Sequence, residues 1–436
     1  MHIPTSHRDS AVDLVRALAI AGVVVLHSLM VGVTLSPEGP LFSNAGEVGG
    51  WIVPVSWVMQ VMPMFFVVGG FAGITALRAQ RRRGTRGTVF AVSRVRRLLI
   101  PAIASVATAG VALALLSDAG LDAELVDTAG YRYGQPLWFL GVFLVLQAML
   151  PALVRLHERA PLRTIGALAA ASVVVDVARV ISDSDGIGYL NLLFVWATMQ
   201  QLGFLLADGR IDALPRRTRI TAAAVALALL LLSFGTGFHS PDLIANTNPP
   251  TTALLLVGVI QTAAFSLFKP QLTAFAERRP VAAFTRFVSA RAMTVYLWHM
   301  PVLLALAGLT ALSGMITGDQ LPALASGQWW LSRPLWLVCT LGTTALLVVP
   351  LSRLERITAP IDTSPARAAI AVLLGASAVV LLLVAGTSPV TATIAIASWL
   401  IALHLTGMPR AAAAIPAVPG IALSRGRARD VARIPG

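Results

Sequence analysis

Residues 12–33 read VDLVRALAIAGVVVLHSLMVGV, an apolar run interrupted by only three ionisable side chains. A membrane-spanning α-helix needs about 20 mostly apolar residues, because each residue adds about 1.5 Å and the hydrocarbon core is about 30 Å thick. The run is longer than the apolar region of a signal peptide, and no small-x-small cleavage site follows it before Pro37. We therefore predict a retained first transmembrane helix.

The same pattern recurs along the chain. Of the 436 residues, 56% are hydrophobic and 12% are charged, whereas soluble domains carry about 25% charged residues. These blocks predict an all-α fold, a polytopic transmembrane helical bundle with about ten core spans and two C-terminal spans. The predicted spans cover residues 12–33, 51–77, 95–116, 136–154, 164–181, 187–207, 220–236, 251–268, 292–313, 333–350, 368–386 and 390–406.

Basic residues are concentrated in every second connection between the predicted spans. The other connections are acidic or neutral: residues 117–135 hold four carboxylates against Arg132 alone, and residues 237–250 hold neither Arg nor Lys. Since Arg and Lys gather in cytoplasmic loops, both chain termini are predicted to be cytoplasmic. The arginine-rich connections are residues 78–97, 155–163, 210–219, 269–291 and 353–367, with a tail from residue 410.

The net charge of +13 is thus a topology signal, and we expect no nucleic-acid partner. All but one of the 33 basic residues are arginines, and Ala is abundant, which indicates a GC-rich bacterial genome and a bacterial plasma membrane. The single cysteine, Cys339, permits no internal disulfide, and no metal-ligand spacing is visible.

Ionisable residues inside a span are costly and are functional candidates by default. Arg16 and His27 are eleven residues apart, so they share one helix face about 16 Å apart along the axis, and Asp13 lies one turn before Arg16. His is the natural general base at neutral pH, so the three residues suggest a polar track that ends at a base. Alternatively, Arg16 reaches the headgroups and His27 bonds a neighbouring helix.

Two further groups of residues allow either a structural or a functional interpretation. Arg94 and Arg97 share a helix face at the predicted start of the third span, where they either anchor the helix or bind a phosphorylated cofactor. Trp138 opens the fourth span, and His299 lies in TVYLWHMP. The structural interpretation places Trp138 and His299 in aromatic belts at the membrane interface.

Asp176 and Arg179 lie one turn apart in the fifth predicted span. They either neutralise each other or face a cavity for an acceptor.

Together these segments resemble the membrane acyltransferase family known as acyltransferase type 3. The matching motifs follow in order over about residues 12–352. They are Arg, ten residues, then His (Arg16 and His27), the span MPMFFVVGGFAG, R-x-x-R (Arg94 and Arg97), LWFLGVFLVL, and YLWHMP. The chain departs from the family where it has DLVR in place of Asp-Gly-Leu-Arg, and FFVVGGF where Ser-Gly-Phe is usual.

The resemblance implies a membrane acyltransferase core over residues 1–352, to which this chain adds a transmembrane hairpin over 353–409. The mixture of Ala, Pro, Gly and Arg over 410–436 predicts a disordered cytoplasmic tail. It implies transfer of an acyl group, most often acetyl, from cytosolic acyl-coenzyme A to a hydroxyl of a carbohydrate or lipid-linked acceptor. His27 would be the catalytic residue, and Arg16, Arg94 and Arg97 would bind the coenzyme phosphates. Asp13, Trp138 and His299 would support them, without a metal.

Two other classes compete with this interpretation. A proton-coupled secondary transporter would also use intramembrane His, Asp and Arg, although the sequence shows no internal repeat. A membrane sensor or assembly scaffold with degenerate sites is the third class.

Overall fold

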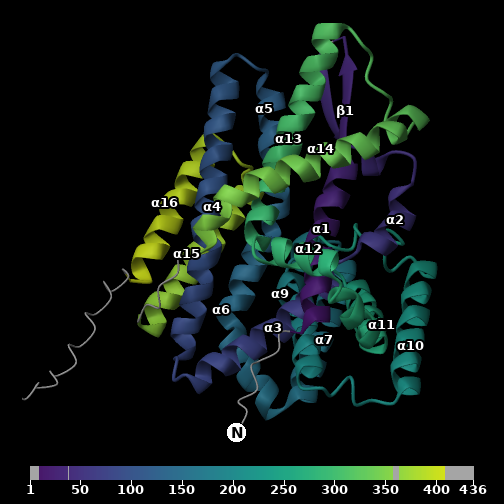
Figure 1. Ribbon diagram of the computed structural model, residues 1–436, viewed down its shortest axis with the longest axis vertical. Helices are drawn as coiled ribbons and strands as arrows, with labels where there is room; N and C mark the ends of the chain where they lie inside the picture. The colour runs from purple at the N-terminus through teal and green to yellow at the C-terminus, as the bar shows by residue number, and fades with distance from the viewer. Residues whose placement is uncertain (1–8, 38, 357–362, 408–436) are drawn as a thin grey trace, which may run out of the picture.

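The computed structural model describes residues 9–37, 39–356 and 363–407, and these form a polytopic bundle of α-helices (Figure 1). The only sheet within these residues is one antiparallel hairpin, β1 (Val31–Ser36) with β2 (Gly39–Asn44). The predicted all-α fold is confirmed. The helices are α1 (Ser10–Met30), α2 (Ile52–Met59), α3 (Met62–Arg82), α4 (Gly87–Asp118), α5 (Ala123–Gly134), α6 (Trp138–Arg159), α7 (Pro161–Ser182), α8 (Asp185–Gly188), α9 (Asn191–Ala207), α10 (Arg216–Gly235), α11 (Ala253–Ala276), α12 (Arg279–Ser289), α13 (Ala292–Thr317), α14 (Gly327–Leu351), α15 (Pro365–Val384) and α16 (Pro389–Leu405), with 3₁₀ turns η1 (Ala45–Glu47), η2 (Gln135–Leu137) and η3 (Ser352–Arg356).

Among the described residues, eleven helical segments are long and apolar enough to cross a membrane. Ten of them lie between α1 and η3, and α15 is the eleventh. The twelfth predicted span corresponds to α16, which is apolar but has only 17 residues. The predicted tail over 410–436 lies outside the described residues.

Helix α1 lies inside the bundle, where it packs against α3, α11, α12, α13 and α14. Its small and aliphatic side chains permit this position, since Ala11, Leu14 and Ala17 are essentially inaccessible. The Asp9 carboxylate caps the helix by accepting a hydrogen bond from the Val12 amide at 3.2 Å. The polar residues of α1 therefore face protein rather than lipid.

The second predicted span is broken, which the sequence pattern did not reveal. Helix α2 ends at Met59 and α3 begins at Met62, with Pro63 in the first turn of α3. Pro63 has no amide hydrogen to donate to the Met59 carbonyl, so the helical hydrogen-bond pattern is interrupted there. Gln261 of α11 spans the break: its amide donates to the Gln60 carbonyl at 2.7 Å and its oxygen accepts from the Met64 amide at 3.1 Å. Backbone groups inside a membrane need such partners.

Close contact of α3 with α9 relies on glycine. A Cβ on Gly70 would collide with the Gln200 carbonyl, and one on Gly203 with the Val67 carbonyl. Small residues let transmembrane helices approach closely. Such close packing matters in a bilayer, because lipid tails are as apolar as the helix surface and the hydrophobic effect does not drive helices together.

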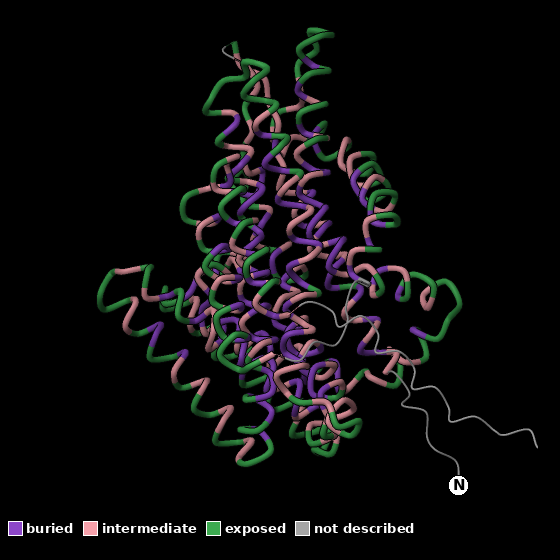
Figure 2. Tube along the Cα trace, turned by 90° about the vertical axis from the view of Figure 1, so that its left-hand side faces the viewer, coloured by how far each residue is buried: buried purple, intermediate pink, exposed green. Residues whose placement is uncertain are grey.

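The C-terminal hairpin is part of the same body. Helix α15 packs on α6, and α16 packs on α4. Trp399 of α16 is fully buried and its indole donates to the Gly375 carbonyl at 3.1 Å. Figure 2 shows buried residues gathered in the interior of the bundle and exposed residues along its outer helices.

Candidate active site

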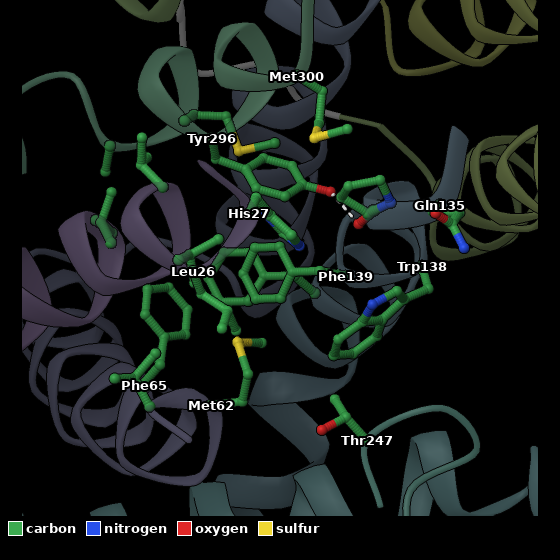
Figure 3. Close-up of a pocket in the computed structure, with 18 of the residues that line it drawn as sticks. Leu26, His27, Met62, Phe65, Gln135, Trp138, Phe139, Thr247, Tyr296 and Met300 are labelled. Carbon is green, nitrogen blue, oxygen red and sulfur yellow. Dashed lines mark hydrogen bonds between the residues drawn. The ribbon is translucent and has the colours of Figure 1, made fainter. Parts of the chain in front are cut away.

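A cavity of about 440 Å³ lies inside the bundle, lined by residues of α1, α3, α4, α6 and α13 and of the connections between helices. One end, the arginine end, is lined by Arg16, Arg94 and Arg97, with Glu355 beside them. The other, the amide end, is lined by Arg132, Gln135, Thr247 and Asn248. His27 and a group of aromatic rings also line the cavity (Figure 3).

The arginine end gathers side chains that the sequence singled out. Arg16 pairs with Asp13 at 2.9 Å across one helical turn, so Asp13 holds the guanidinium in place. Arg94 lies close enough to Arg16 and Arg97 for mutual repulsion, and its guanidinium stacks over Phe90 at 5.0 Å. Three guanidinium groups that converge in this way can bind an anion that carries several charges.

The sequence pattern placed Arg94 and Arg97 at the start of a span, but α4 begins earlier, at Gly87. Both arginines therefore lie in the second and third turns of the helix, facing the cavity rather than serving only as a membrane anchor.

Glu355 was missed by the sequence analysis. It lies in η3, and one carboxylate oxygen, Oε1, accepts from the Thr294 amide at 2.8 Å and from the Thr294 hydroxyl. The other oxygen, Oε2, is buried 3.9 Å from Arg97 Nη2. A lone Glu beyond the last matching motif gave no signal; its role is visible only once η3 folds back onto α4 and α13.

His27 and His299 meet at the centre of the bundle. His27 Nδ1 lies 2.9 Å from His299 Nε2, and the two rings meet edge to edge with centroids 5.1 Å apart and planes 18° apart. His299 is completely buried. The belt interpretation of His299 is therefore wrong: the residue lies two turns inside α13, beside His27, and its side chain is inaccessible.

Aromatic rings form the wall around His27. Phe139 packs edge-on against Tyr296 at 4.9 Å, and the Tyr296 hydroxyl donates to the Pro136 carbonyl at 2.7 Å. Trp138 stacks on the buried Trp196 at 5.9 Å and presents its ring to the cavity, which a belt tryptophan would not do. Figure 3 shows Trp138, Gln135 and Thr247 farther along the cavity from His27.

The amide end depends on the loop between α10 and α11. Gln60, at the break of the second span, donates to the Leu243 carbonyl at 2.6 Å and to the Thr247 hydroxyl at 2.7 Å. These bonds hold Thr247 and Asn248 against the cavity. Sequence analysis missed them because a polar loop residue carries no periodic signal.

Asp176 and Arg179 do not neutralise each other. Asp176 accepts from Asn191 at 2.8 Å and from the Thr252 amide at 2.6 Å, and it lies 3.3 Å from His239. Arg179 pairs with Asp185 at 3.5 Å. Asp176 thus fastens the start of α11 and does not line the cavity.

The family profile described as "Acyltransferase domain" matches residues 9–353. The chain belongs to the acyltransferase type 3 family. The match covers more than three quarters of this acyltransferase, from α1 into η3, and includes every residue proposed from the sequence. No curated protein and no solved structure matches the chain. Family membership favours acyl transfer over secondary transport. Across the residues that the structure describes, no three His, Cys, Asp or Glu side chains gather as a metal site.

Proposed function

We propose that this membrane acyltransferase moves an acyl group, acetyl in the simplest case, from acyl-coenzyme A to a hydroxyl of a carbohydrate or lipid-linked acceptor. The observation that carries the proposal is one cavity with three arginines at one end and His27 beyond them.

The arginine end suits the phosphates of the coenzyme. Arg16, Arg94 and Arg97 supply planar, permanently charged donors that can bind phosphate oxygens in pairs. Glu355 would hold Arg97 in the cavity, as Asp13 would hold Arg16, and the guanidinium N–H groups that these carboxylates leave would bind the phosphates. The positive-inside pattern supports a cytoplasmic position for this end, where acyl-coenzyme A is available.

The thioester would lie near His27. Arg16 and His27 are about 16 Å apart along α1, a distance that an extended pantetheine arm can follow through the apolar part of the cavity. The acceptor would enter from the amide end, where Gln135, Thr247 and Asn248 offer groups that pair with hydroxyls and Trp138 offers a flat face to a sugar ring.

In the reaction His27 accepts the proton of the acceptor hydroxyl as its oxygen attacks the thioester carbonyl. The new C–O bond forms, the C–S bond breaks, and the proton returns to the departing sulfur. The products are the acylated acceptor and free coenzyme thiol. A neutral imidazole suits this step because it stays uncharged in a dry cavity until it takes the proton.

The test is incorporation of radiolabelled acetyl from acetyl-coenzyme A into glycan or lipid-linked acceptors by purified protein in nanodiscs. His27→Ala should lower the transfer rate by about two to four orders of magnitude while donor binding persists. His404→Ala is the matched control, because His404 is exposed near the end of α16, away from the cavity. Full activity of well-folded His27→Ala would refute the role of His27.

The same preparation separates the competing classes. Substrate flux into proteoliposomes without any acyl-coenzyme A would favour a transporter. Absence of incorporation with every acceptor and acyl donor offered would favour a sensor or scaffold.

A further inference from the structure

We propose that His299 is a positioning residue that fixes the tautomer of His27, so that Nε2 of His27 is the atom that accepts the hydroxyl proton. This inference rests on the proposed function. It is carried by a chain of contacts from a backbone carbonyl through His299 to His27.

The chain begins at Tyr296. His299 Nδ1 lies 2.5 Å from the Tyr296 carbonyl oxygen. A carbonyl oxygen only accepts hydrogen bonds, so Nδ1 of His299 must carry a hydrogen. In a neutral imidazole the other nitrogen, Nε2, is then an acceptor.

His299 is best described as neutral. It is completely buried, and in the part of the chain that the structure describes neither it nor His27 hydrogen-bonds a carboxylate. A buried imidazolium without an opposite charge would be costly. A neutral His299 accepts at Nε2, so the hydrogen in the 2.9 Å contact belongs to His27 Nδ1.

The tautomer of His27 follows from this contact. With Nδ1 protonated, a neutral His27 has its lone pair on Nε2. His27 lines the cavity and His299 does not, so Nε2 is the ring nitrogen left for the substrate. Without His299, the hydrogen of His27 could sit on either nitrogen, and the tautomer protonated at Nε2 cannot act as a base toward the cavity.

His299 also orients the positively charged His27 imidazolium that forms during the reaction. When His27 takes a proton at Nε2, its Nδ1–H continues to donate to His299, and the Tyr296 carbonyl orients His299 from behind. The partner is a neutral ring rather than a carboxylate, so it orients the imidazolium without holding it by a full opposite charge. The proton can then return readily to the departing thiolate.

Two variants distinguish positioning from packing. His299→Gln can accept from His27 Nδ1 through its oxygen and donate to the Tyr296 carbonyl through its amide, so it should keep kcat within about tenfold. His299→Leu fills the same space without either bond, and kcat should fall by about 10²–10⁴-fold with little change in the KM for acetyl-coenzyme A. Equal loss in both folded variants, or full kcat in His299→Leu, would overturn the proposal.

Nitrogen NMR of the ¹⁵N-histidine-labelled protein reads the tautomer directly, with His27→Ala used to assign the signal. In the wild type, His27 Nε2 should resonate as an unprotonated nitrogen, and His299→Leu should shift it toward the protonated range. A protonated Nε2 in the wild type would refute the assignment. This test is independent of the proposed function, because the His27 Nε2 resonance reports the tautomer even if the wild-type protein transfers no acyl group.

Discussion

Replacing Gln261 by Leu tests whether one side chain keeps the broken second span stable. Gln261 supplies the hydrogen-bond partners of the Gln60 carbonyl, at 2.7 Å, and of the Met64 amide, at 3.1 Å. Leu has a similar volume and supplies neither. Gln60 and Met64 are buried, so water would not replace the lost partners.

The expected loss follows from two orphaned backbone groups. Each buried polar group left without a partner costs about 1–3 kcal/mol, so Gln261→Leu should lower the free energy of unfolding by about 2–6 kcal/mol. The matched control is Gln200→Leu. Gln200 is completely buried in α9, and neither its amide nitrogen nor its oxygen has a hydrogen-bond partner. Its replacement should leave stability unchanged or raise it by about 1 kcal/mol.

Unfolding of both variants in mixed micelles with increasing SDS, followed by tryptophan fluorescence, gives the comparison. The expected result is early unfolding of Gln261→Leu alone. If the two variants unfold together, the hydrogen bonds of Gln261 do not stabilise the break. If Gln200→Leu is the weaker protein, the Gln200 amide makes a stabilising hydrogen bond, and the prediction for this control is wrong.

Three further predictions follow from the cavity, the topology and the helix contacts. Replacing Arg94 and Arg97 by Gln should weaken acetyl-coenzyme A binding, measured by calorimetry, by about 1.5–3 kcal/mol for each lost charge-assisted bond. The control Arg82→Gln, at the exposed end of α3, should bind the donor normally. Unchanged affinity in the double variant would mean that the pair only anchors the helix in the membrane. Cysteines placed at residues 84–88 should react with an impermeant thiol reagent only from the cytoplasmic side, and those at 240–248 only from outside; reaction of both from one side would contradict the topology. Gly70→Ala should destabilise the protein by about 1–3 kcal/mol, because its Cβ meets the Gln200 carbonyl, whereas Gly69→Ala has open space and should stabilise α3 slightly; thermal unfolding in detergent measures both, and equal effects would refute close α3–α9 packing as the cause.

The sequence was most informative where a polar residue interrupts an apolar run. Arg16 and His27 stand out for this reason, whereas Arg94 and Arg97 stand out because they share one helix face. All four line one cavity. The span pattern is equally local, which is why the helix order was predictable. The belt interpretation failed for His299 because the partner that makes it an interior residue is 272 positions away.

Long-range pairing also explains the other omissions. The break in the second span requires Gln261, about 200 residues away from Gln60, and the buried position of Glu355 requires Thr294. Neither partner is marked by local periodicity. A single sequence therefore showed which residues are unusual, while only the folded chain shows what they contact.

The attachment of α15 and α16 has a consequence for how the protein is made. These two helices cover faces of α6 and α4, yet they leave the ribosome long after those two helices. Roughly 250 residues separate the end of α4 from the start of α15, so at about 5–20 residues per second that face waits on the order of 10–50 s for its cover. During that interval the insertion machinery or surrounding lipid must occupy the faces of α4 and α6, and α15 and α16 then replace that temporary occupant.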